Sequence, residues 1–158
     1  MLILSKLYRK LKKFNSFTFV NKIFHIKVYI ITGVFRACIL YFPFNKLKNY
    51  MGNKNEESKR NITKNEYNEA VRIAMTIKRV VKYTPWESKC LVQSLTAQYF
   101  LNKKHISSTL YLGLSREEIL NPDRKSTELI AHSWIRCGDY FVTGGNGQGF
   151  AVVAKFCK

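Results

Sequence analysis

The chain has 158 residues, which is enough for one domain with a helical extension and too few for two enzyme domains. Its formal net charge of +17 is uneven, because residues 1–62 hold 13 of the 27 lysines and arginines but only two acidic residues. Such a positive field attracts anionic partners, among them lipid headgroups and acidic peptides, without identifying one. We do not expect nucleic acid as a partner.

The cysteines indicate a reducing compartment. The four of them form no CxxC pair, and the first residues, MLILSKLYRK, lack the charge-first order and the cleavage site of a secretory signal. We therefore predict a cytoplasmic location. No cofactor is predicted, and no metal either, because Cys90, His132 and Cys137 include no closely spaced ligand pair of the kind that structural zinc sites use.

In chain order, the N-terminal region comes first, and it predicts helices. Between residues 2 and 51 the apolar residues recur at three to four positions with lysines between them. The most apolar part, residues 28–44, is 17 residues long and carries Arg36 near its middle, whereas a bilayer-spanning helix needs about 20 largely uncharged residues. We predict one or two buried or interfacial helices, and the flanking lysines leave peripheral membrane contact open.

A change in composition divides the chain after this region. Over residues 51–61 Gly, Asn and charged residues replace the apolar ones, which is typical of a linker or loop. We therefore predict a basic helical extension over residues 1–62 and a core domain over residues 63–158.

Two further helices are predicted at the start of the core domain. Thr63 and Glu66 form the pattern of a capping box, and apolar residues then recur on one helical face. Pro85 interrupts the pattern. A second amphipathic pattern follows from Cys90 and ends near Asn102.

Beyond this helix the period of the sequence changes to that of strands. Four short runs, 107–115, 129–136, 139–143 and 150–156, are rich in β-branched and aromatic residues and are bounded by Gly, Asn, Pro or Asp. Helices followed by a small antiparallel sheet predict an α+β fold.

Cys90 lies in the stretch WESKCLVQSL, at the predicted start of the second helix of the core domain. A helix N-terminus stabilises a thiolate through its free amides and its partial positive charge. Two helix starts compete: Thr84 as cap would leave Cys90 one turn inside the helix, whereas Ser88 as cap would place it in the first turn. We favour Ser88, and in that register the amides at and after Cys90 could also serve as oxyanion donors.

His132 is the candidate general base. A cysteine peptidase or acyl transferase needs a group that takes the proton of the thiol and later protonates the leaving amine, and histidine does this near neutral pH. His25 lies in the basic extension and His105 at a helix end, where the dipole explains it. A strand histidine or a helix-start cysteine alone is more often structural, but together Cys90 and His132 form the predicted catalytic pair.

Several segments together resemble the transglutaminase-like cysteine peptidases of lasso-peptide biosynthesis, in their stand-alone form without a leader-binding domain. The segments are KCLVQSLTAQYFLNKKHISSTLYLGL, LIAHSWIRCGDYFVTGG and FAVVAKF, and the similarity covers residues 86–156. The resemblance implies a papain-like arrangement in which helices carry the cysteine against an antiparallel sheet that carries the histidine. It matches Cys90 to the nucleophile and His132 to the general base.

The resemblance also implies a function. Such thiol proteases remove the leader from a ribosomally made precursor peptide and so free the N-terminal amine of the core peptide, which an asparagine-synthetase-like cyclase then joins to an acidic side chain. The N-terminal region of this chain predicts helices rather than a small strand-rich leader-binding module. A separate leader-recognition protein is therefore an expected partner.

The third member of the catalytic triad is where this chain departs from the wider family. That family places an Asp about twelve residues after the histidine, and here the position is Gly144. Asp139 is the acidic residue nearby, but a tight turn at Gly138 and Asp139 puts it at the far end of a hairpin. At roughly 3.3 Å per strand residue, it would lie about 20 Å from His132.

The same hairpin register predicts other partners for the imidazole. It places Gly145 opposite His132, with Thr143 diagonal on the same face and Asn146 next to it. A hydroxyl, an amide side chain or a backbone carbonyl is therefore expected to orient the ring, because a Cys–His pair also works with a neutral third group.

Two alternative functions stay open at this point. The same pair could carry out amide transfer, as a transglutaminase or deamidase does. The basic chain could instead be a non-catalytic membrane-surface protein, in which Cys90 would be replaceable.

Overall fold

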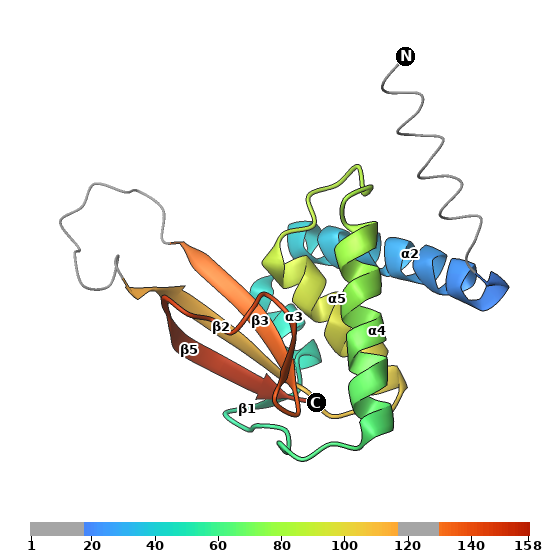
Figure 1. Ribbon diagram of the computed structural model, residues 1–158. Coiled ribbons are helices and arrows are strands. Elements are labelled where there is room, and N and C mark those ends of the chain that lie inside the picture. Colours follow the sequence, from blue (N-terminus) through green and yellow to red (C-terminus); the bar gives the residue numbers. More distant parts are fainter. Residues whose placement is uncertain (1–17, 117–129) are drawn as a thin grey trace.

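The computed structural model of the protein describes residues 18–116 and 130–158 (Figure 1). These residues form four helices and five strands, and the long helices precede the main strands along the chain, so the predicted α+β class is confirmed. The helices are α2 (Phe19–Tyr41), α3 (Phe44–Tyr50), α4 (Lys64–Val80) and α5 (Cys90–Lys103), and the strands are β1 (Asn53–Lys54), β2 (Thr109–Ser115), β3 (Ala131–Cys137), β4 (Tyr140–Thr143) and β5 (Phe150–Cys157).

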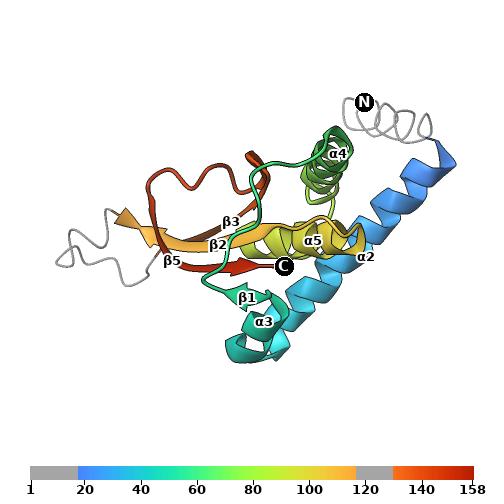
Figure 2. The ribbon, with the colours of Figure 1, turned by 90° about the horizontal axis from the view of Figure 1, so that it is seen from below.

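The sheet is antiparallel throughout, in the order β1, β5, β2, β3, β4. Helices α2, α4 and α5 lie together at one side of it (Figures 1 and 2), and α5 packs directly on β2, β3 and β4. β1 lies inside the predicted linker, where it pairs with the end of β5. Two residues are too few to show a strand period, and the sequence analysis did not predict this strand.

The predicted N-terminal helical region is confirmed from residue 19, with a break at Pro43; its first 17 residues lie outside the described part of the chain. Phe42 is extended, which is the backbone conformation favoured before proline. By length and composition, α2 is the one described helix that could cross a membrane. Its inner side is part of the protein core, because Val28, Thr32 and Phe35 are buried.

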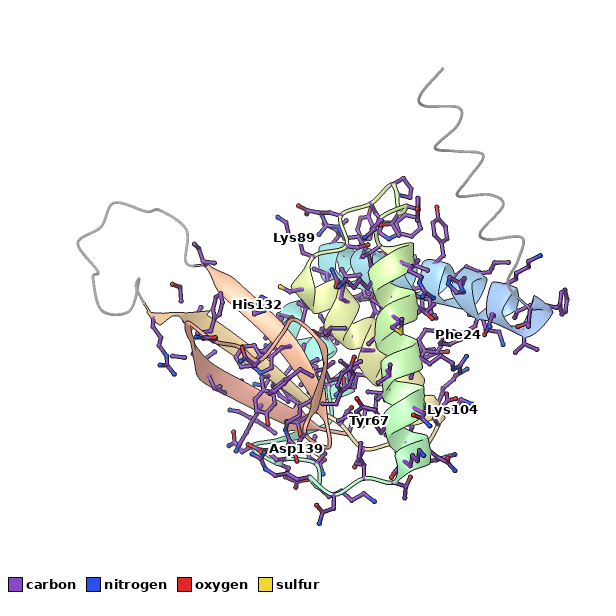
Figure 3. All side chains as sticks on the ribbon, in the orientation of Figure 1. Phe24, Tyr67, Lys89, Lys104, His132 and Asp139 are labelled. Atoms are coloured by element: carbon purple, nitrogen blue, oxygen red, sulfur yellow. The ribbon has the colours of Figure 1, made fainter. Side chains whose placement is uncertain are left out.

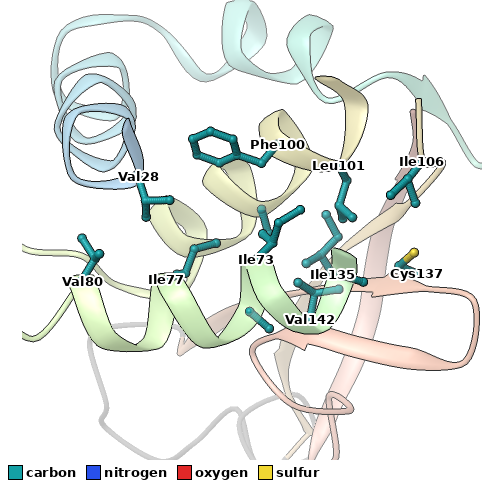
Figure 4. Close-up of a cluster of buried hydrophobic side chains, with 13 residues drawn as sticks. Val28, Ile73, Ile77, Val80, Phe100, Leu101, Ile106, Ile135, Cys137 and Val142 are labelled. Atoms are coloured by element: carbon teal, nitrogen blue, oxygen red, sulfur yellow. The ribbon is translucent and has the colours of Figure 1, made fainter. Parts of the chain in front are cut away.

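Two clusters of buried apolar side chains hold the helices on the sheet, and α2 contributes to both. The described part of the predicted extension therefore packs on the predicted core domain, and the division at residue 62 stays a prediction. The first cluster, drawn in Figure 4, includes Val28, Ile73, Ile77, Val80, Phe100, Leu101, Ile106, Ile135, Cys137 and Val142, and the second includes Phe35, Leu47, Met51, Val92, Leu95, Leu110 and Phe156.

The capping box predicted at the start of α4 is confirmed. The Glu66 amide donates to Thr63 Oγ1 at 3.2 Å, and the Thr63 amide donates to Glu66 Oε2 at 2.6 Å. These bonds favour the carboxylate and hold the pKa of Glu66 below its ordinary value. The start of α4 is thus fixed by local interactions, while its apolar face packs on α5.

A buried arginine fastens the segment before α4 to the sheet. The Arg136 side chain on β3 is 3% exposed and lies 3.2 Å from the Glu57 carboxylate. It also donates to Tyr111 Oη and to the backbone oxygens of Ser58 and Gly138. A guanidinium is stable in such a place only when its donors have partners.

We expect the substitution Arg136→Met to lower the free energy of unfolding by roughly 2–4 kcal/mol, because it leaves buried acceptors without donors. Urea unfolding measures this loss. The matched control is Arg60→Met, which removes only an exposed ion pair with Asp139 and should leave the midpoint unchanged. Equal effects of the two variants would contradict the role given to Arg136.

Candidate active site

Cys90 is the first residue of α5, so the prediction that it lies in the first helical turn is confirmed. The predicted cap was wrong by one residue: Lys89, not Ser88, is the N-cap. The reason is that the Ser88 hydroxyl already bonds Thr84 Oγ1 at 2.9 Å. The Lys89 side chain makes no capping hydrogen bond. The first amides of α5 are therefore not occupied by the side chain of the N-cap residue.

The loop before Cys90 is held by its own hydrogen bonds. Thr84 Oγ1 donates to the Trp86 carbonyl at 3.1 Å, and Gln93 Nε2 reaches back to the Ser88 carbonyl at 2.7 Å. The Gln93 bond ties the first turn of α5 to the loop. The position of Cys90 therefore depends on a closed local network rather than on a free loop.

The same loop is fastened to α2. The Trp86 ring lies 4.8 Å from the Tyr29 ring, and a side chain at Gly33 would meet Trp86 at 3.0 Å. Glu87 pairs with Arg36 at 3.0 Å. Two cations, Lys89 as the larger cause and then Arg36, hold the pKa of the Glu87 carboxyl below its ordinary value. Helix α2 thus braces the approach to the candidate nucleophile.

A buried set of hydroxyls sets α5 against the hairpin of β3 and β4. Ser94 Oγ lies 3.1 Å from Thr143 Oγ1 and accepts a hydrogen bond from Ser133 Oγ at 3.3 Å. Cys90 precedes Ser94 by about one helical turn and lies on the same side of α5. His132 precedes Ser133 on β3, so its backbone adjoins this contact, while the alternation of a strand turns its side chain away from that of Ser133, to Trp134 and Phe150.

Figure 3 labels Lys89, the residue before Cys90 in the sequence, and His132 on β3. The Cys90 side chain is half-buried and so is that of His132. No hydrogen bond joins the two in the described part of the chain. In free enzymes such catalytic hydrogen bonds are often long and shorten only with substrate.

The His132 ring is held by one backbone carbonyl and two aromatic rings. Its Nε2 lies 2.7 Å from the Gly144 oxygen, and its ring centroid lies 4.7 Å from Phe150 and 5.9 Å from Trp134. A carbonyl oxygen can only accept, so Nε2 must carry the proton. In the neutral ring Nδ1 then has the lone pair and can accept a proton from a thiol.

Gly144 is the residue at which the resemblance implied an Asp, and its carbonyl lies against the His132 ring. Of the predicted alternatives, Thr143 bonds Ser94, and Asn146 Oδ1 accepts from the Gln148 amide instead. Of these three alternatives, the backbone carbonyl is therefore the one that the structure places in a hydrogen bond with His132, and its role as a third catalytic group stays a prediction.

The predicted hairpin register was correct only near the turn. Cys137 pairs with Tyr140 as expected, but a bulge follows and Ile135 pairs with Thr143. One extra residue moves every later side chain to the other face of the sheet, so Gly145 is not opposite His132 and Thr143 points to α5. Asp139 lies at the far end of the hairpin, as predicted, where it pairs with Arg60.

Gly144 has no room for a side chain. Its φ is +75°, and an added Cβ would lie 2.3 Å from the Ser133 oxygen and 2.7 Å from Trp134 Cβ. A glycine is therefore required to bring this carbonyl to the imidazole. By contrast, Gly145 has a φ of +67° and nothing within 4 Å of an added Cβ.

Ser94 was not predicted from the sequence, although its spacing from Cys90 could have indicated it. Ser94 lies four residues after Cys90 in the buried part of α5. A buried hydroxyl needs a hydrogen-bond partner, and a polar residue on the side of the predicted nucleophile indicates a contact with the strand that carries the base.

Two of the other thiols, those of Cys137 and Cys157, are poorly suited to nucleophilic chemistry. Burial raises the pKa of Cys137 to about 11 and also raises the pKa of Cys157. Among residues 18–116 and 130–158, no three His, Cys, Asp or Glu side chains gather in a way that could hold a metal ion.

Comparison with known families places the protein. A family profile described as the transglutaminase-like superfamily matches residues 39–155, which include Cys90, His132 and Gly144. The chain therefore belongs to the transglutaminase-like superfamily, whose members are typically cysteine peptidases or acyltransferases. Searches of curated proteins and of solved structures each gave no match.

We expect the neutral His132 ring to be the Nε2–H tautomer, because Nε2 donates to the Gly144 carbonyl. Long-range proton–nitrogen NMR spectra of the imidazoles measure this. Gly144→Ala should shift the His132 signals and lower stability, because its Cβ has no space, whereas Gly145→Ala should leave the His132 tautomer unchanged. An Nδ1–H tautomer in the wild-type protein would contradict the assignment.

Proposed function

We propose that the protein is a cysteine peptidase that removes the leader from a lasso-peptide precursor, with Cys90 as nucleophile and His132 as general base. The observation that carries the catalytic part is the hydrogen bond from His132 Nε2 to the Gly144 carbonyl, because it leaves Nδ1 as the ring nitrogen that can accept a proton. The substrate rests on the resemblance of residues 86–156 to the stand-alone leader peptidases.

The proposed reaction begins with proton transfer from the Cys90 thiol to His132 Nδ1. The thiolate attacks the carbonyl carbon of the last leader residue, and the carbonyl oxygen becomes an oxyanion that the first amides of α5 can stabilise. The imidazolium gives its proton to the departing amine of the core peptide. Water, deprotonated by the neutral imidazole, then hydrolyses the thioester and releases the leader.

The partners follow from what this reaction needs. A separate leader-recognition protein would present the precursor, and an asparagine-synthetase-like cyclase would use the freed amine. Both steps belong to a cytoplasmic maturation pathway for the peptide antibiotic. The uneven positive charge supports docking of such partners, because it favours acidic surfaces.

Amide transfer or deamidation is the second candidate, because the superfamily includes acyltransferases and the same thioester serves both reactions. The products separate the two. Cleavage splits the precursor, whereas deamidation raises its mass by about one dalton, the difference between NH₂ and OH.

We expect Cys90→Ala and His132→Ala each to abolish release of the leader from the cognate precursor in the presence of the leader-recognition protein. Mass spectrometry of the mixture measures this. The control Cys157→Ala should cleave at the wild-type rate, because that thiol lies at the far end of β5. Cleavage that survives Cys90→Ala would exclude the proposed nucleophile, and a mass increase without cleavage would favour deamidation.

Alkylation gives a second test that needs no substrate. At pH 8, a thiol with a pKa of about 11 is about one part in a thousand thiolate, so Cys137 should resist iodoacetamide in the folded protein. We expect Cys90 to be alkylated before it, and more slowly in His132→Ala. Peptide mapping measures both rates, and faster labelling of Cys137 would count against the assignment.

A further inference from the structure

Helix α2 presents an apolar face to solvent along its whole length. At 100° per residue, Phe19, Ile26, Ile30 and Tyr41 lie on one side of the helix, opposite the buried side. Ile26 and Ile30, in the middle of this face, are 52% and 55% exposed. Figure 2 shows α4 and α5 on the inner side of α2 and no described element on its outer side.

This face continues through the break at Pro43 into α3. Ten of the 16 large apolar residues that are exposed in the described part of the chain lie between residues 19 and 44. Soluble monomers rarely expose apolar patches of this extent, and such patches usually mark an interaction site. The outer face of α2 is defined by Phe19, Val20, Ile26, Tyr29, Ile30, Val34, Leu40 and Tyr41, and it is continued by Phe42 and Phe44.

The charges around the outer face of α2 identify the kind of surface it fits. Residues 1–55 contain no Asp or Glu, Lys22 and Lys27 border the face, and Lys46 and Lys48 follow in α3. Apolar and aromatic side chains bordered mainly by cations are typical of helices that lie on an anionic bilayer, and the carboxylate at this edge, Glu87, is paired with Arg36.

The packing of α2 favours an orientation in the plane of the bilayer. Val28 and Phe35 on the inner side are buried in the two core clusters, and Arg36 pairs with Glu87. Insertion of α2 across a membrane would remove these side chains from the core. The outer face can instead enter the interface while the inner side stays in place.

We propose that the outer face of α2, with the start of α3, docks the protein in plane on an anionic lipid bilayer. The proposal is independent of the peptidase reaction. Apolar burial supplies the affinity, and the lysines make it depend on anionic lipid and on salt.

The test is sedimentation of the full chain with vesicles of phosphatidylcholine alone or mixed with phosphatidylglycerol. We expect binding to the anionic vesicles that weakens as salt rises. The double variant Ile26→Gln and Ile30→Gln should lower the partition coefficient by about tenfold or more, because two partly inserted side chains lose their apolar burial. Lys22→Gln with Lys27→Gln should flatten the salt dependence.

The matched control replaces two apolar residues of similar exposure on β5. Val152→Gln with Val153→Gln, at positions 52% and 56% exposed, should bind vesicles as the wild type does. Absence of anionic-vesicle binding, or equal binding by the Ile26 and Ile30 variant, would overturn the proposal.

Two further results would also overturn it. A wild-type dimer that the Ile26 and Ile30 variant dissociates, without vesicle binding, would assign the face to a second copy of the chain. Retention in membranes after alkaline extraction would show a spanning helix. Precursor cleavage in solution should be unchanged in the Ile26 and Ile30 variant, so failure of the docking and failure of the peptidase are distinguishable.

Discussion

The buried contact between Ser94, Ser133 and Thr143 is the interaction on which the candidate site depends. These three hydroxyls are buried and form hydrogen bonds with one another. The bonds fit one register of α5 on the hairpin. Apolar packing alone would tolerate a sliding of the helix along the strands. Because Cys90 lies one turn from Ser94 and His132 is the neighbour of Ser133, this register sets the backbone positions of both residues relative to each other.

The Gly144 carbonyl gives the imidazole its orientation without adding a charge. A carboxylate at this position would both fix the tautomer and balance the imidazolium. A carbonyl does only the first, so in a thiolate–imidazolium pair the sulfur itself would supply the counter-charge. The left-handed backbone at Gly144 brings the carbonyl to the ring, and the backbone and Trp134 beside it leave no space for a side chain at this position.

Local sequence patterns predicted the helices and strands. The predictions that were wrong depended on contacts that these patterns do not contain. Thr63 and Glu66 lie three residues apart and could be recognised directly. Ser88 failed as a cap because Thr84 engages its hydroxyl, and the bulge after Phe141 escaped notice because one extra residue leaves the strand composition unchanged. A backbone carbonyl could be predicted from the sequence as one of several partners of His132. Selecting it among them required the strand register that this bulge creates.

Helix α2 links the surface of the molecule to the site. Tyr29 and Gly33 of α2 lie against Trp86, and Arg36 pairs with Glu87, so the loop that leads to Cys90 rests on this helix. A surface that meets the outer face of α2 therefore acts on the same rigid element that positions the nucleophile. Docking through Ile26 and Ile30 would fix how the end of α5 faces the bilayer without moving it relative to β3, because Val28 and Phe35, which hold α2 in the core, lie on the opposite side of the helix.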